Sequence, residues 1–202
     1  LLDYLSKFNP TKYVSKSEGI RDNLQVTIEK PDPKNGFLVE EKISFADYIK
    51  DVYSGDPVKR DTLDDECEIL VVGAGFAGLL LWHKLMAAGF ADVRFCERGG
   101  DVGGTWYWNR YPGIACDVES YSYLPLLEEM GYVPTMKFAS GFEILEYCQK
   151  MAEKFGFYDR CLFHTSVEKT EWSENEKVWT VHTDRGDRMR AKFVILANGI
   201  LT

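Results

Sequence analysis

Three glycines stand at a spacing that can bind phosphate groups. Gly73, Gly75 and Gly78 form a Gly-x-Gly-x-x-Gly pattern. In such a pattern the first glycine lets the backbone turn sharply off a strand, the second lets a pyrophosphate approach the main chain, and the third lets the next helix pack closely. The free N–H groups and positive dipole at the start of that helix favour phosphate. The pattern is common, so the rest of the chain must indicate whether a dinucleotide binds here.

An acidic residue follows this turn at a suitable distance. Glu97 comes about 20 residues after Gly78 and directly follows the apolar stretch 92–96. A carboxylate at this point can accept hydrogen bonds from the ribose hydroxyls of an adenosine. The alternative is a solvated charge at a strand end, but three glycines together with the acid favour ribose binding. Arg98 could be taken for a 2′-phosphate ligand, yet beside this acid we expect it to lie on the surface.

The second informative stretch covers residues 99–123. It is rich in glycine and aromatic residues, and no helix or strand period runs through it. A loop of this length inside a compact domain is usually functional. Aromatic rings can stack on a large planar ligand, and glycines let the backbone come near it. The alternative is a loop whose aromatic residues only seal the core.

The elements that must position these residues begin as strand, helix, strand. A β-branched run over 68–72 predicts a strand, a helical pattern starts at Leu79, and 92–96 predicts the next strand. Ser140 and Glu143 form a capping-box pattern before a helix over 140–155. Four further strands are expected over 162–165, 167–172, 178–183 and 189–197, the last with a buried part at 193–197.

This succession predicts the fold class. A plain NAD-type Rossmann domain would continue with alternating helices and strands, whereas here the crossover after the helix is a β-meander. We therefore predict an α/β, Rossmann-like FAD-binding domain with a parallel sheet and a meander crossover, incomplete within this chain. Residues 67–202 would be the N-terminal part of that domain. Residues 1–66 would be an N-terminal extension, with a short helix over about 44–53.

Composition limits the classes of partner. The chain has 202 residues, 45% hydrophobic and 28% charged, with a net charge of −8. This charge disfavours nucleic acid and anionic membranes, and no apolar run approaches the roughly 20 residues of a membrane span. The five cysteines form no Cys-x-x-Cys pair, and the three histidines show no metal-ligand spacing. We expect reduced thiols in a cytoplasmic protein and no metal site.

With these motifs in place, the sequence resembles the Baeyer–Villiger monooxygenases, within the class B flavin monooxygenases. The resemblance runs from about Cys67 to Thr202. Its most specific part is the run 103–113, Gly-Gly-Thr-Trp-Tyr-Trp-Asn-Arg-Tyr-Pro-Gly, followed by Cys116-Asp117 and Glu119-Ser120. The run 196–199 is similar to the family's Ala-Thr-Gly segment, with Asn198 in place of the usual Thr or Ser.

The resemblance implies FAD as the cofactor and assigns roles to particular residues. Asp117 would lie near the isoalloxazine and orient an arginine from a later part of the polypeptide, which in this family supports oxygen transfer to a ketone. The other residues that would bind FAD are Gly73, Gly75, Gly78, Glu97, Gly104, Thr105, Trp106, Tyr107, Trp108, Tyr123 and Val167. The implied reaction uses NADPH and O2 and converts a small-molecule ketone to an ester or lactone.

Two features depart from the family pattern. Many members carry arginine where this chain has Ala115, and that arginine helps to bind the nicotinamide cofactor. The second glycine turn for NADPH and the catalytic arginine are not among these 202 residues, so we expect them in the remainder of the polypeptide and the segment alone to be inactive. An N- or S-oxidising flavin monooxygenase, or a non-catalytic FAD-domain remnant, remain as alternatives.

Overall fold

The computed structural model describes residues 25–31, 38–44 and 51–200, and the chain divides into two units, Leu1–Val52 and Tyr53–Thr202. In the first unit, β1 (Gln25–Pro31) and β2 (Leu38–Ser44) form an antiparallel pair. The helix predicted over about 44–53 falls mostly on 45–50, outside the described residues. Its first predicted residue, Ser44, ends β2, and residues 51–53 are not helical.

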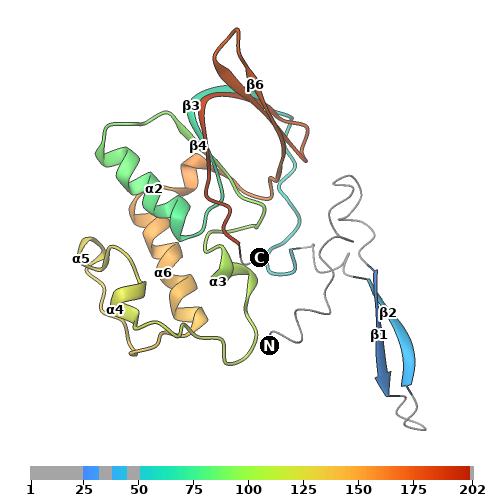
Figure 1. Ribbon diagram of the computed structural model, residues 1–202. Coiled ribbons are helices and arrows are strands. Elements are labelled where there is room, and N and C mark those ends of the chain that lie inside the picture. The colour runs from blue at the N-terminus through green and yellow to red at the C-terminus, as the bar shows by residue number, and fades with distance from the viewer. Residues whose placement is uncertain (1–24, 32–37, 45–50, 201–202) are drawn as a thin grey trace. The chain divides into compact units, whose positions relative to one another are not determined.

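The second unit contains a six-stranded sheet, ordered β5-β4-β3-β8-β7-β6 (Figure 1). The four strands from β5 to β8 in this order run parallel, while β8, β7 and β6 pair antiparallel as the predicted meander. The strands are β3 (Asp64–Val72), β4 (Val93–Cys96), β5 (Cys161–Leu162), β6 (Val167–Ser173), β7 (Val178–Thr183) and β8 (Arg188–Leu196). This is the Rossmann-like arrangement with a meander crossover that the sequence predicts.

Strand β3 is longer than its apolar run. It starts at Asp64 rather than at residue 68, and its acidic beginning lies opposite the basic beginning of β8. Arg188 donates to the Asp64 carboxylate at 3.0 Å. Charge pairing between neighbouring strands therefore extends the sheet beyond the hydrophobic core.

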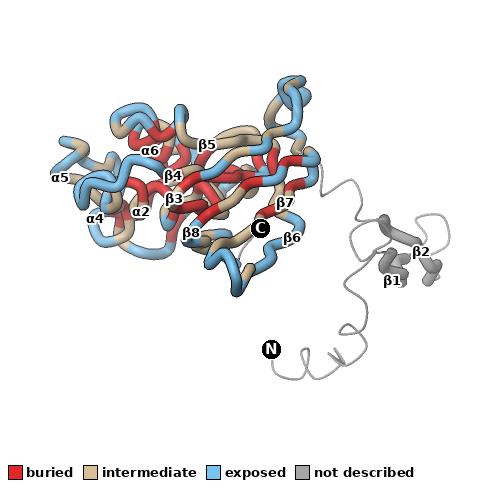
Figure 2. Tube along the Cα trace, turned by 90° about the horizontal axis from the view of Figure 1, so that it is seen from above, coloured by how far each residue is buried: buried red, intermediate tan, exposed pale blue. Residues whose placement is uncertain are grey.

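Two helices cover one face of the parallel strands. The helices are α2 (Phe76–Ala87) and α6 (Gly141–Lys154), which lie beside the sheet in Figure 1. Their side chains Leu79 and Ile144 are buried in one core cluster with Val71 and Phe95 of the strands, and Figure 2 shows buried chain along β3 and β4. A smaller cluster on the other face joins β3 and β4 to the meander through Leu70, Cys96, Val181, Met189 and Ala191. Strand β3, which leads into the glycine turn, is thus packed on both faces of the sheet, by the helices on one side and by the smaller cluster on the other.

The start of α6 only half matches the predicted capping box. Ser140 Oγ accepts from the Glu143 N–H at 3.2 Å, as expected of a cap. The Glu143 carboxylate does not return to the cap, because it accepts from the Thr135 N–H at 2.8 Å, the Thr135 hydroxyl at 2.7 Å and the Tyr132 hydroxyl at 2.9 Å. This side chain instead fixes the loop that precedes α6.

The structure corrects three predictions. The stretch 99–123 is not all loop, since α3 (Thr105–Trp108) and α4 (Ser120–Tyr123) are single helical turns within it; α5 (Leu127–Met130) and a 3₁₀ turn, η3 (Tyr158–Arg160), follow. The strand over 162–165 shrinks to β5, because His164 takes a left-handed φ of 49°. The part of β8 predicted as buried leaves Phe193 57% and Leu196 71% exposed, because β7 pairs with β8 only as far as Ala191.

No helix in the described part of the chain is long and apolar enough to cross a membrane.

Candidate dinucleotide site

The glycine turn connects β3 to α2 and lies beside the carboxyl end of β8, at the place where the strand order of the sheet reverses. Gly73 has a φ of +110°, and a Cβ atom there would lie 2.5 Å from the Ala197 carbonyl oxygen. A Cβ atom on Gly78 would lie 2.2 Å from the Gly73 carbonyl oxygen. These contacts require glycine at both positions, because any side chain would push the turn, α2 and β8 apart.

Free hydrogen-bond donors face this turn from the start of α2. Gly75 is the N-cap and supplies no side-chain cap, and the first turn of the helix contains no acidic residue. The N–H groups of Phe76, Ala77 and Gly78 find no acceptor among the described residues, whereas the Leu79 N–H bonds to the Gly75 carbonyl. Unpaired N–H groups and the positive helix end together form a site for a phosphate or another anion.

Glu97 lies directly beside the turn. Its side chain is buried, and its carboxylate accepts from the Ala74 N–H at 2.8 Å and the Gly99 N–H at 2.7 Å. Burial raises the pKa of Glu97, while these two backbone hydrogen bonds oppose the shift. A carboxylate can accept about four hydrogen bonds, so acceptor capacity remains for the hydroxyls of a ligand.

The turn that contains α3 lies against the backbone of the glycine turn. The Gly103 N–H donates to the Ala74 carbonyl at 3.0 Å, and a Cβ atom on Gly104 would lie 2.9 Å from the Gly75 Cα. The side chains of Trp106 and Tyr107 are buried in the core. These two residues can therefore face a ligand at the turn through their backbone rather than through their rings.

An aromatic group borders the start of α2. The Tyr123 hydroxyl accepts from Trp106 Nε1 at 2.9 Å, and the Tyr123 ring meets Phe76 edge-on with the ring centroids 5.6 Å apart. Phe76 is the first residue of α2, so this group stands beside the unpaired N–H donors. No sequence pattern marked Phe76, because an apolar residue within the glycine motif is typical of an ordinary core position.

The remaining predicted site residues are more dispersed. The Thr165 N–H donates to the Glu97 carbonyl at 2.8 Å, which brings the start of β6 and half-buried Val167 towards the turn. Asp117 is exposed, and no described side chain pairs with it. The structure thus groups the glycines, Glu97, the α3 turn and Tyr123, and leaves Asp117 on the surface.

Two contacts near Glu97 have no counterpart in the sequence motifs. The exposed Arg98 stacks on the Trp108 ring, 4.6 Å from its centroid. Ser54 Oγ lies 3.3 Å from His164 Nε2, and a Cβ atom on Gly100 would meet both side chains. Ser54 and His164 are far apart in the sequence, so no local pattern could have shown that they meet beside the loop after Glu97.

The described residues contain no group of His, Cys, Asp and Glu side chains that could hold a metal ion, and all five cysteines are free thiols. The polar groups directly at the glycine turn are the unpaired backbone N–H donors of α2 and the buried carboxylate of Glu97. They suit a phosphate-containing ligand with hydroxyl groups.

Comparison with known proteins agrees with this geometry. A family model described as an NAD(P)-binding Rossmann-like domain matches residues 71–129. Neopentalenolactone D synthase of Streptomyces avermitilis is 48% identical over 158 residues, 78% of this chain and 26% of that protein. A Baeyer–Villiger monooxygenase of Streptomyces coelicolor is 44% identical over 173 residues, 86% of this chain and 28% of that protein. The crystal structure of OTEMO with FAD and NADP is 34% identical with a TM-score of 0.64, over 67% of this chain and 26% of that one.

The fold and the glycine turn define a Rossmann-like dinucleotide-binding domain. Within that class, the relatives that the chain matches at 44–48% identity include Baeyer–Villiger monooxygenases. It spans about a quarter of the length of the curated relatives that it matches.

Proposed function

We propose that the second unit is the FAD-binding portion of an NADPH- and O2-dependent flavin monooxygenase that inserts oxygen next to a ketone carbonyl. One observation carries the proposal. The N–H groups at the start of α2, which have no acceptor, and the buried carboxylate of Glu97 both lie at the same glycine turn. This pair matches the two polar parts of an adenosine dinucleotide, its pyrophosphate and its ribose. A relative of this fold was crystallised with FAD and NADP, which supports the choice of cofactor.

In this proposal each residue has a limited task. The turn from Gly73 to Gly78 binds the pyrophosphate, and Glu97 accepts from the ribose hydroxyls. The α3 backbone and Tyr123 border the bound cofactor, and Val167 contacts its adenine end through its backbone. FAD, once bound, supplies the redox and oxygen-transfer chemistry. Asp117 acts as a positioning residue for an arginine from the remainder of the polypeptide, which suits a carboxylate that lacks a partner among the described residues.

We expect the binding of the nicotinamide cofactor to depend mainly on other parts of a complete enzyme. Ala115 is exposed and cannot offer a charge, so it would contribute no ionic contact to NADPH. Oxidation of nitrogen or sulfur in place of a ketone is the second candidate, because the site described above binds the cofactor and does not select the substrate.

FAD binding can be tested on the chain itself. We expect the purified protein to bind FAD and to show flavin absorbance. Gly75→Ala should keep the fold, since its Cβ atom would meet only the Gly104 backbone, at 3.4 Å from Cα and 3.8 Å from N. It should still weaken FAD binding by about a hundredfold or more, because the methyl group stands where the pyrophosphate approaches. Gly55→Ala is the matched control, since a Cβ atom there meets nothing within 4 Å. A protein that binds no FAD, or a Gly75→Ala variant that binds it equally well, would contradict the proposal.

The reaction requires a complete enzyme. Residues 53–202 can replace the matching stretch of the Streptomyces coelicolor relative, and NADPH consumption can then be followed with ketones, amines and sulfides. We expect ketone-dependent consumption that falls at least tenfold in Asp117→Ala. A folded, FAD-loaded chimera that responds to amines or sulfides alone would favour the second candidate.

A further inference from the structure

The segment that leads into β3, residues 53–63, connects the two ends of the parallel strands without forming a helix or a strand. Near its end, Arg60 donates two hydrogen bonds of 2.6 Å to Asp187, at the amino end of β8. Its middle part, residues 55–59, is exposed. Its first two residues contact the loop that follows Glu97, at the carboxyl end of β4. We call residues 53–63 the strap.

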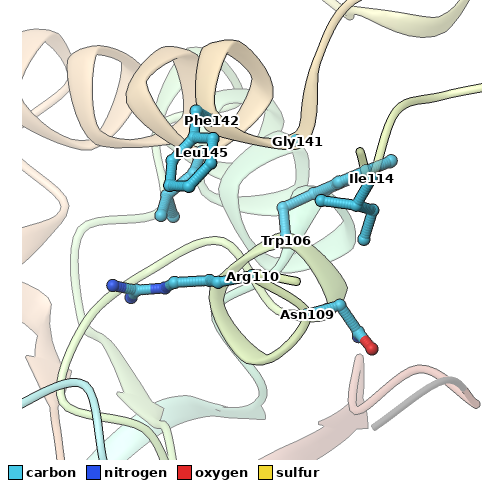
Figure 3. A pocket seen from close by; sticks show the side chains of 7 residues that line it. All are labelled: Trp106, Asn109, Arg110, Ile114, Gly141, Phe142 and Leu145. Carbon is cyan, nitrogen blue, oxygen red and sulfur yellow. The ribbon is translucent and has the colours of Figure 1, made fainter. Parts of the chain in front are cut away.

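The first residue of the strap, Tyr53, lies against α3. Its ring meets the ring of buried Tyr107 edge-on, with the centroids 6.0 Å apart and the planes at 81°. The Arg110 guanidinium carbon lies 4.2 Å from the Tyr53 centroid and 4.5 Å from the Tyr107 centroid. Figure 3 shows Arg110 and Asn109 leaving the end of α3 in opposite directions. Arg110 thus connects the strap to α3 through cation–π contacts.

The second residue of the strap, Ser54, packs on the loop between Glu97 and α3. Its Oγ lies 3.3 Å from His164 Nε2. A Cβ atom on Gly100 would lie 2.3 Å from Ser54 Oγ and 2.7 Å from His164 Nε2, so both side chains pack directly on the Gly100 backbone. The His164 N–H donates to the Gly99 carbonyl at 3.0 Å. Gly99 and Gly100 are therefore enclosed by the strap and the turn that contains His164.

These contacts reach the groups that the proposed function assigns to FAD. The Gly99 N–H donates to the Glu97 carboxylate at 2.7 Å, and the Gly100 N–H donates to the Tyr107 hydroxyl at 3.2 Å. Tyr107 belongs to α3, and the start of that turn lies against the backbone of the glycine turn. The strap thus contacts both the loop that orients the buried carboxylate and the helical turn beside the phosphate site.

We propose that Tyr53 and Ser54 are positioning residues for the cofactor site, because they hold the loop 99–107 in its binding arrangement before FAD arrives. This role rests on the proposed function. A loop that is already ordered loses little conformational entropy when a ligand binds, so the contacts increase affinity without touching the ligand. Tyr53 is 40% exposed, and the strap keeps its separate attachment to Asp187. Loss of the Tyr53 ring should therefore loosen the loop and leave the domain folded.

The affinity of the intact chain for FAD tests this role, measured by the change in flavin fluorescence on binding. We expect Tyr53→Ala to raise the dissociation constant about tenfold, because FAD must then order the loop itself. Tyr53→Phe keeps the ring and should stay within about twofold of the unaltered chain. Val58→Ala is the matched control, since it lies in the same strap with a side chain that is 78% exposed, and it should leave the affinity unchanged.

Amide hydrogen exchange without FAD separates positioning from a general loss of stability. In Tyr53→Ala and in Ser54→Ala, the Gly99 amide should exchange about tenfold faster or more, because the loop that carries it opens locally. The Leu63 amide, which donates to Asp187 at 2.9 Å at the other end of the strap, should keep its rate. A purely structural role would accelerate both amides together.

Two results would overturn the positioning role. One is a Tyr53→Ala variant that binds FAD as tightly as the unaltered chain, and the other is equal acceleration of the Gly99 and Leu63 amides. An unaltered chain that binds no FAD would instead contradict the proposed function. The exchange rates would still show whether the strap orders the loop, so the two failures are distinguishable.

Discussion

Two buried carboxylates stand at opposite ends of the parallel strands, and their surroundings differ. Glu97 follows the carboxyl end of β4, and Asp187 precedes the amino end of β8. Burial raises the pKa of Glu97, which is held by backbone N–H groups. The Arg60 guanidinium holds the pKa of Asp187 well below its usual range, with support from the Leu63 N–H and the Thr183 hydroxyl.

This difference separates a structural carboxylate from one suited to a ligand. Asp187 is paired with a cation from its own chain, so its hydrogen bonds close the contact between the segment 60–63 and the β7–β8 turn. Glu97 lies beside unpaired helix N–H groups. A buried carboxylate without a close cation costs stability, and proteins retain such groups most often at functional sites.

The largest effect should come from Asp187→Asn. The change leaves Arg60 without its partner and should lower the free energy of unfolding by about 2–4 kcal/mol at pH 7. Because the folded-state pKa of Asp187 is lowered, its stabilisation is present above the unfolded value of about 4 and is lost as pH falls. Urea unfolding at pH 7 and pH 3 measures this. If Asp187→Asn lowered the free energy of unfolding equally at pH 7 and pH 3, the Asp187–Arg60 ion pair would not be what stabilises the amino end of β8.

Glu97→Gln should have a smaller effect with the opposite pH trend. The amide places an N–H₂ group opposite a backbone N–H, which costs about 1–2 kcal/mol. The folded-state pKa of Glu97 is raised, so its contribution is complete below about pH 4 and is lost as pH rises. The variant should therefore lose more stability at pH 4 than at pH 7. FAD binding should weaken about tenfold or more, because the ribose loses a charged acceptor. A larger loss at pH 7 would place Glu97 with Asp187 as a structural group.

The smallest effect should come from Asp64→Asn, which removes an exposed pair at the same end of the sheet as Asp187. The Asp64 side chain is 75% exposed and lies 3.0 Å from Arg188. Exposed pairs contribute little, so the change should be under about 0.5 kcal/mol and should vanish in 1 M salt. Chemical denaturation at two salt concentrations checks this, and a loss comparable to that of Asp187→Asn would remove the distinction between buried and exposed pairs.

The sequence predicts those features that depend on local spacing. The strand over 68–72, the glycine turn and the helix after it, the position of Glu97 and the β-meander all follow from short patterns, and the structure shows each element. Local patterns do not predict contacts between segments that are far apart in the sequence. Arg60 meets Asp187 across 127 positions of sequence, and single helical turns such as α3 are too short to show a period.

Burial of β8 illustrates the same limit. An apolar run in an α/β domain normally lies between two neighbouring strands, and this led to the prediction that 193–197 is buried. The exposure of Phe193 and Leu196 reflects the end of pairing with β7, which the run itself does not encode. The roles of all the predicted cofactor-binding residues, Asp117 and Val167 included, stay predictions, because they depend on a bound cofactor and on other parts of a complete enzyme.

One measurement tests the contrast between the two carboxylates most directly. Carbon-detected NMR can follow the side-chain carboxyl signals of Glu97 and Asp187 in one sample, through a pH titration and then with saturating FAD. We predict that Glu97 titrates above its ordinary value and Asp187 below its own, and that FAD shifts the Glu97 signal while the Asp187 signal stays in place. A Glu97 signal that FAD leaves unchanged, or an Asp187 signal that FAD moves, would contradict the assignment of the cofactor site to the carboxyl end of the sheet.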